Sequence, residues 1–222
     1  MEMSKDIKVF LNYRRLKHLK RCNNFPVLIS EDVAQHSYFV TIIAMILADE
    51  YNTWVSDLMD FQKAKIPAKD RVYHPFVNTD IMLRKALLHD VEEAFTSDIP
   101  WNIKHMSSKT HEVISQATAQ KMNEVYEGCK TMELYCSLNK RCKERLEGQI
   151  VEVADTLELA LYSFEEIQMG NKSMKSMLSK CLGIIQGYSA YNVLKDASPF
   201  FVTLLTILNE PDTILEDTLD IN

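Results

Sequence analysis

Two adjacent residues that can bind a metal ion, His89 and Asp90, lie within the apolar segment ALLHDVEEAF (86–95). The spacing of the apolar residues around them predicts a helix over 80–94. A histidine and an aspartate beside a leucine stripe have two interpretations: they belong to a solvated face, or they bind a divalent cation. The second interpretation requires further ligands from elsewhere in the chain.

Candidate ligands of the same kinds lie on two other predicted helices. His36 is on the apolar stripe of a helix that begins after Ser30 or Asp32 and runs to about residue 51. Asp155 shares a helix face with apolar residues of the segment 133–168. Taken singly, a buried histidine is usually a hydrogen-bonded core residue, and an aspartate is usually a cap or an ion-pair partner.

The combined set offers two imidazoles and two carboxylates, without a thiolate. Such a mixture of nitrogen and oxygen ligands suits a divalent ion such as Mn²⁺, Co²⁺, Fe²⁺ or Zn²⁺, with coordination positions left for water and substrate. A structural zinc site would instead be expected to contain cysteines.

Length and charge narrow the class of protein. The chain has 222 residues and a net charge of −6, which fits one large domain or two small ones. The negative charge argues against a general nucleic-acid binder, which is usually basic. The negative net charge does not exclude a small anionic substrate that is bound by a local group of cations.

The cysteines and the N-terminal sequence indicate the cellular compartment in which the protein is expected. The number of cysteines is odd and none form a CxxC pair, so we expect reduced thiols and no disulfide framework. No apolar run is long enough for a membrane helix, and the acidic start MEMSKDIKVF is not a secretory signal. These features predict the cytoplasm, which would be the host's if the protein is viral.

The elements that hold the candidate ligands are helices, because glycine and proline are scarce and strand alternation is absent. We predict an all-α fold in a single domain over 1–222, with its core in about 5–170, C-terminal helices 171–210 packed on that core, and an acidic tail 211–222. Residues 52–79 form a long connection, with which a short helix at 54–63 is compatible. The other expected helices are 4–20, 80–94, 107–127, 133–168 with an interruption at Gly148 and an end at Gly170 and Asn171, 172–187 and 198–209.

The pattern His … His-Asp … Asp on helices resembles the HD-domain metal-dependent phosphohydrolases. The local sequences VAQHS (33–37), HDVEEAFTSDIPWNIK (89–104) and VEVADTLELALYSFEEI (151–167) are similar to the bacterial HD-type 5'-deoxynucleotidases. The family pattern H-D-x-x-E-x-x-x-x-D-[LI]-P is matched at every fixed position. The resemblance covers about residues 5–170 and implies a helical HD-domain bundle with extra C-terminal helices.

The resemblance also implies roles for individual residues. Glu93, four residues after His89 on the predicted helix, falls on the catalytic glutamate, and Asp98 falls on a second acidic position close to the substrate and the attacking water. The divalent metal ion, which could be Co²⁺, Mn²⁺, Zn²⁺, Fe²⁺ or Mg²⁺, would be bound by His36, His89, Asp90 and Asp155.

Further positions match the substrate-binding residues of the family. Arg21 ends the basic run RRLKHLKR (14–21), whose other cations we interpret as a solvated face, and it matches an arginine that orients the phosphate. Cys22 replaces a tryptophan that helps to reject ribose, so selectivity for deoxyribose is either lost or supplied by another group. The remaining substrate-binding candidates are Asp98, Ile99, Pro100, Trp101 and Lys104.

These observations favour an enzyme that converts 2'-deoxynucleoside monophosphates to deoxynucleosides and phosphate. The alternative within the same family is a deoxynucleoside triphosphate triphosphohydrolase of the dATP type, for which Lys17, Lys20 and Lys104 could supply extra cations. A third possibility is a metal-stabilised binding module without activity, which the presence of both Glu93 and Asp98 disfavours. We expect a small-molecule deoxynucleotide partner, no nucleic acid, no membrane, and a homo-oligomer, because relatives form dimers or larger rings.

Overall fold

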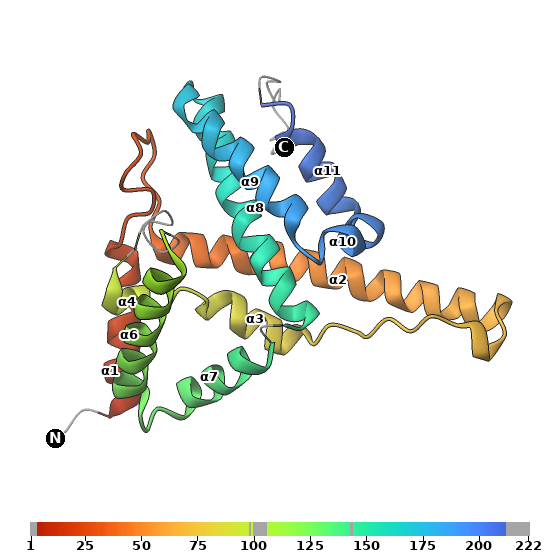
Figure 1. The fold of residues 1–222 in the computed structure, drawn as a ribbon, viewed down its shortest axis with the longest axis horizontal. Helices are drawn as coiled ribbons and strands as arrows, with labels where there is room; N and C mark the ends of the chain where they lie inside the picture. The colour runs from red at the N-terminus through yellow and green to blue at the C-terminus, as the bar shows by residue number, and fades with distance from the viewer. Residues whose placement is uncertain (1–3, 98, 100–105, 143, 212–222) are drawn as a thin grey trace, which may run out of the picture.

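The computed structural model describes residues 4–97, 99, 106–142 and 144–211, which form an assembly of helices (Figure 1). Within these residues the strand-like pairing is an isolated bridge between Lys20 and Asp32, so the all-α prediction is confirmed. The α-helices are α1 (Lys5–Tyr13), α2 (Val33–Lys65), α3 (Thr79–Leu88), α4 (Glu93–Thr96), α6 (Ser108–Tyr126), α7 (Lys130–Cys142), α8 (Leu146–Gln168), α9 (Lys175–Gly187), α10 (Tyr191–Ala197) and α11 (Pro199–Leu208). Short 3₁₀ turns occur at η1 (Leu16–His18), η2 (Ala68–Asp70) and η3 (Lys172–Met174).

The long helix α2 extends across the width of the molecule in Figure 1. It begins at Asp32, whose side chain accepts a 2.9 Å hydrogen bond from the backbone N–H of Gln35, while the Gln35 side chain accepts a 3.1 Å bond from the backbone N–H of Asp32. The predicted end near residue 51 is wrong, and so is a separate helix at 54–63. No glycine or proline occurs between Tyr51 and Ile66, so the helix continues and the connection shortens to 66–78.

The predicted helix over 80–94 is interrupted where the candidate ligands lie. Asn78 caps α3 by accepting a 3.1 Å bond from the backbone N–H of Ile81. The helix ends at Leu88, a turn follows, and α4 begins at Glu93. The expectation that His89 and Glu93 share one continuous helix face is therefore wrong.

The first predicted helix, over 4–20, is also wrong beyond Tyr13, where α1 ends. Leu19 is extended, its carbonyl accepts a 3.0 Å bond from the N–H of Val33, and Arg21 N–H donates to the carbonyl of Glu31 at 2.9 Å. This pairing with the segment before α2 draws the chain out of helical geometry. It also brings Arg21 next to the start of α2.

The C-terminal half follows the predictions more closely. The segment 133–168 is divided, but α7 and α8 meet near residues 143–145 and not at Gly148, which lies in the first turn of α8. The end of α8 is as predicted: Gly170 has a φ of +101°, and Asn171 N–H donates to the carbonyl of Glu166 at 2.8 Å. The sequence did not predict α10.

The main core lies where α8 packs on α2 and α9 packs on α8, and α3, α10 and α11 complete it (Figure 1). Leu47 of α2, Leu157 of α8 and Ile185 of α9 are fully buried in it. A second cluster joins α1, α6 and α7 through Val9, Tyr126 and Met132. The C-terminal helices thus share the core of α2 and α8, and the assignment of the whole chain to one domain stays a prediction. Within the described residues, no helix combines the length and the apolar character needed to cross a membrane.

Candidate metal centre and substrate cavity

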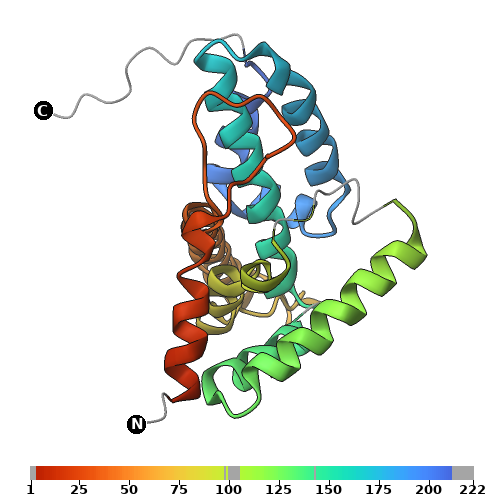
Figure 2. The ribbon, with the colours of Figure 1, turned by 90° about the vertical axis from the view of Figure 1, so that its left-hand side faces the viewer.

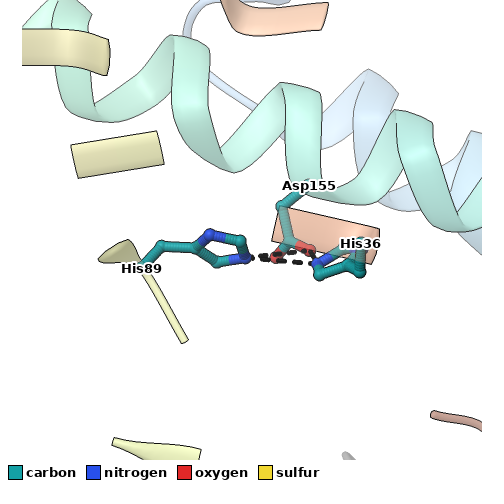
Figure 3. A group of neighbouring side chains, drawn as sticks. All are labelled: His36, His89 and Asp155. Atoms are coloured by element: carbon teal, nitrogen blue, oxygen red, sulfur yellow. Dashed lines mark hydrogen bonds and ion pairs between the residues drawn. The ribbon is translucent and has the colours of Figure 1, made fainter. Parts of the chain in front are cut away.

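Four side chains converge from three separate parts of the chain. His36 comes from the first turn of α2, His89 and Asp90 from the turn after α3, and Asp155 from the middle of α8. His36 Nε2 lies 3.2 Å from His89 Nε2, 3.0 Å from Asp155 Oδ1 and 3.6 Å from Asp90 Oδ2. His89 Nε2 lies 3.2 Å from Asp90 Oδ2 and 3.9 Å from Asp155 Oδ1. Figure 3 shows His36, His89 and Asp155 pointing toward one another.

These distances fit a shared cation. Ligand atoms about 2.0–2.2 Å from a Zn²⁺-like ion lie about 3.0–3.5 Å from their neighbours around it. The two imidazole Nε2 atoms are 3.2 Å apart, which is within that range. The side chain of His36 is fully buried, whereas that of Asp155 is 43% exposed, so the cluster is closed on one side and open on the other. An open side is what a catalytic ion needs for water and substrate.

The electrostatics keep both aspartates charged. Burial alone would raise the pKa of Asp90, but His89, His36 and Arg21 outweigh it and hold the pKa well below its usual range. Burial would also raise the pKa of Asp155, but this pKa is lowered, mainly by the hydrogen bond with His36. Burial would lower the pKa of His89, yet Asp90 and Asp155 raise it to about 9. Ionised carboxylates are the form in which aspartate binds metal ions.

Arg21 and Glu93 lie beside this cluster. The guanidinium Nη1 of Arg21 is 3.8 Å from Asp90 Oδ2, and its side chain is 15% exposed. Burial opposes the charge on Arg21, but Asp155, Asp90 and Glu93 raise its pKa, so it stays a cation. Glu93, the first residue of α4, is buried and lines the same cavity as Arg21.

The cavity has a volume of about 250 Å³ and lies between the cluster and α9. One wall carries charged residues: Arg21, Asp90, Glu93 and Asp155. The opposite wall is largely apolar, with Lys180 as its cation, and consists of Met177, Lys180, Cys181, Ile184 and Tyr188. A polar patch also occurs where Thr156 Oγ1 and the Tyr188 hydroxyl lie 2.9 Å apart. The site can therefore hold an anionic group at one wall and an apolar ring at the other.

Comparison with known proteins identifies the family. The family model described as 5'-deoxynucleotidase YfbR-like matches residues 8–202.

The chain belongs to this family. A 5'-deoxynucleotidase of Yersinia pestis (strain Pestoides F) is 27% identical over 183 residues, which cover 78% of this chain and 84% of the relative. An HD-domain phosphohydrolase from Listeria innocua is 24% identical, with a TM-score of 0.66, over 93% of this chain and 95% of its own. The HD phosphohydrolase of cyanophage S-2L, solved with dA and one catalytic Zn²⁺, is 14% identical, with a TM-score of 0.55, over 90% of this chain and 96% of its own. These solved structures share the fold.

The predicted resemblance is thus confirmed: this YfbR-like protein is a hydrolase of phosphoric esters, and it shares the fold of solved HD-domain phosphohydrolases. The predicted site residues have different outcomes in space. The four candidate ligands meet, Arg21 and Glu93 line the cavity beside them, and Ile99 lines it too. Asp98, Pro100, Trp101 and Lys104 lie outside the described residues.

The lysines that precede Arg21 are solvated, whereas Cys22, which follows it, is partly buried. Lys17 and Lys20 are exposed, as expected for the basic run. Cys22 is partly buried against the main core and has a φ of +53°, in a turn where its carbonyl accepts a 2.8 Å bond from Phe25 N–H. Whether Cys22 affects the choice between deoxyribose and ribose stays a prediction.

The sequence did not predict that α9 lines the cavity. Met177, Cys181, Ile184 and Tyr188 recur at three- and four-residue steps, so the sequence contains a helix face. Nothing in that spacing tells a core-facing stripe from one that lines a substrate cavity. Only the packing of α9 against α8 makes the distinction.

Proposed function

We propose that the protein is a metal-dependent 5'-deoxynucleotidase, which hydrolyses 2'-deoxynucleoside 5'-monophosphates to deoxynucleosides and phosphate. The observation that carries the proposal is the convergence of His36, His89, Asp90 and Asp155, with Arg21 beside them in one cavity. The substrate class is supported by the curated relatives, which are named 5'-deoxynucleotidases. A homo-oligomeric state and a cytoplasmic location belong to this proposal as predictions.

The metal site would be formed by those four side chains. A divalent ion, such as Co²⁺, Mn²⁺, Zn²⁺, Fe²⁺ or Mg²⁺, would supply Lewis acidity toward a phosphate oxygen and lower the pKa of a coordinated water. Fully buried His36 and partly buried His89 fix the closed side of the site, and Asp155 faces the open side. The acidic pair stays ionised because the neighbouring cations outweigh the cost of burial.

The protein residues around the phosphate would act on charge and on protons. Arg21 is cationic at the cavity wall and would bind nonbridging oxygens, which stabilises the charge of a loose transition state. Glu93 would orient or deprotonate the attacking water, whose oxygen forms the new bond to phosphorus, or pass a proton to the leaving oxygen. The bond from phosphorus to the 5'-oxygen breaks, and that oxygen leaves protonated. Asp98 is proposed as a second acidic group near the water.

The nucleoside would lie toward α9. Met177 and Ile184 offer apolar contact for a base, and the hydroxyl groups of Thr156 and Tyr188 offer hydrogen bonds to a sugar. These groups are candidates for a sugar selectivity that would replace the one given by the family's tryptophan, whose position Cys22 occupies.

A second candidate function is a deoxynucleoside triphosphate triphosphohydrolase. Lys180 lines the cavity in addition to Arg21, and a second cation favours a longer phosphate chain. The two functions differ in their products, since the first releases inorganic phosphate and the second releases triphosphate.

The test is a screen of deoxy- and ribonucleoside monophosphates and triphosphates with Mn²⁺, Co²⁺ and Mg²⁺, with the products separated by ion chromatography. The proposal predicts inorganic phosphate from deoxynucleoside monophosphates. Triphosphate as the product would favour the second function. If metal raises the melting temperature but no nucleotide is hydrolysed, the protein is a metal-stabilised binding module and the proposal fails.

A further inference from the structure

The second ring nitrogen of His36 has a buried partner. His36 Nε2 faces the ligand cluster, and His36 Nδ1 is hydrogen-bonded to Glu158 Oε2. His36 is fully buried, and Glu158 is 4% exposed. Because both nitrogens are engaged, the orientation of this ring is fixed from two sides.

Glu158 and the candidate ligand Asp155 come from the same face of α8. They are three residues apart, so their side chains are neighbours on the helix surface. Asp155 Oδ1 contacts Nε2 of His36 at 3.0 Å, while Glu158 contacts Nδ1 of the same ring. One helix turn of α8 therefore holds both nitrogens of a histidine that belongs to α2.

Glu31 extends this arrangement toward Arg21. A carboxyl oxygen of Glu31 lies within 4.8 Å of ligand atoms of Glu158 and His36, and the backbone carbonyl of Glu31 accepts a 2.9 Å bond from Arg21 N–H. Burial and the charge of Glu158 raise the pKa of Glu31 to about 8. Glu31 therefore lies close to both members of the His36–Glu158 pair.

The same three groups could be considered a second metal site, since ligand atoms of Glu31, His36 and Glu158 lie within 4.8 Å of one another. The donor chemistry argues against it. A neutral imidazole has one lone pair, on the nitrogen that carries no proton. His36 can therefore bind the cluster ion through Nε2 only if Nδ1 carries the proton, and Glu158 is then its acceptor.

We propose that Glu158 is a positioning residue for His36. Glu158 accepts the hydrogen bond from Nδ1–H, which leaves the lone pair on Nε2 for the metal ion. The inference rests on the proposed function, because it takes His36 to be a metal ligand. Loss of such a partner typically costs 10- to 100-fold in metal affinity or activity.

The test uses the full chain with three substitutions. Glu158→Met removes the acceptor and keeps a similar length, and Glu158→Gln retains an oxygen that can accept from Nδ1–H. Glu152→Met is the matched control, because Glu152 lies on α8 with an exposed side chain. Two readouts are independent of turnover: the affinity for Co²⁺ from its absorption spectrum, and the protonated nitrogen of neutral His36 from long-range ¹H–¹⁵N NMR of the metal-free protein.

In the wild type and in Glu152→Met we expect the His36 proton on Nδ1. In Glu158→Met the proton is no longer confined to Nδ1 of His36, and the affinity for Co²⁺ falls 10- to 100-fold. In Glu158→Gln, the Nδ1–H tautomer and the Co²⁺ affinity are partly restored. Unchanged tautomer and unchanged Co²⁺ affinity in Glu158→Met would overturn the inference. If Glu158→Met does not fold, Glu158→Ala, which also lacks an acceptor, is measured in its place, and the same result would overturn the inference. A wild type that binds no Co²⁺ would instead refute the proposed metal site, and the NMR comparison would still decide the role of Glu158.

Discussion

Glu166 is a buried carboxylate that ties the loop before α2 to α8. Its oxygens accept 2.8 Å bonds from the backbone N–H groups of Leu28 and Ile29, and a 2.6 Å bond from Asn171 Nδ2. The Tyr162 hydroxyl adds a 2.6 Å bond to the carbonyl of Ile29. Figure 2 shows this loop beside α8. The loop follows Arg21, so its anchoring bears on the candidate site.

Glu166→Gln keeps the shape of the side chain but replaces one accepting oxygen with a donating NH₂ group. Three donors surround the carboxylate, so at least one of them loses its acceptor and faces another donor. A hydrogen bond to a charged group contributes about 1.5–3 kcal/mol, and a buried donor left unpaired costs about 1–3 kcal/mol. Because Glu166 is fully buried, we expect the free energy of unfolding to fall by about 2–4 kcal/mol.

The pH dependence follows from the same bonds. Burial would raise the pKa of Glu166, but Asn171, Ile29 and Leu28 outweigh it and lower the pKa below its ordinary value of 4.5. A carboxyl whose pKa is lower in the folded state contributes stability that is complete above the unfolded value and is lost as the pH falls through the folded one. The difference between wild type and Glu166→Gln should therefore be full at neutral pH and shrink as the pH falls below about 4.5.

The assay is urea unfolding followed by far-UV circular dichroism, for wild type and Glu166→Gln, at neutral pH and at a series of values below 4.5. Glu152→Gln serves as the control, because this side chain is exposed on the same helix. A loss of less than about 0.5 kcal/mol at neutral pH, which is the usual range for surface substitutions, would refute the reasoning. So would a difference that stays constant on acidification.

Other predictions concern the candidate site. Glu93→Ala should retain bound metal and lose about 10²- to 10⁴-fold in kcat if Glu93 is an acid–base group; unchanged turnover would remove it from the mechanism. His89→Ala should lose bound metal, measured by elemental analysis, and a full complement of metal would discredit the ligand set. Lys180→Met should raise KM by about 5- to 30-fold with little change in kcat if Lys180 binds phosphate, and an unaltered KM would exclude that contact. Removal of metal with a chelator should lower the melting temperature and abolish hydrolysis, and both should return with Co²⁺ or Mn²⁺; activity that survives chelation would contradict the proposed cofactor.

The helix boundaries that the sequence predicted correctly depend on contacts within three or four residues. Asp32 and Gln35 cap each other, and Asn78 caps α3, because the partner N–H groups lie in the next turn. Gly170 and Asn171 end α8 for a similar local reason. The helical spacing and the lack of strand alternation predicted an all-α fold in the same way, since both are patterns over a few neighbouring residues.

The wrong boundaries share a different cause. The sequence ended α2 near residue 51, where the apolar stripe changes, yet Val55 is fully buried against the core and the helix continues. It extended the first helix to residue 20, although pairing with residues 31–33 draws that segment away. In both cases the deciding partner is distant in the chain, so no local pattern contains it.

The sequence by itself determined which residue types the candidate centre uses: His36, the pair His89–Asp90, and Asp155 are each visible from helical spacing and motif. Only the tertiary structure decided that their ligand atoms meet, that α9 forms the opposite wall, and that Glu158 contacts His36. The physical reason is that helical periodicity gives the face on which a side chain lies but not what that face packs against. That choice depends on the burial of all helices together, and the partners here are 122 residues apart in the chain.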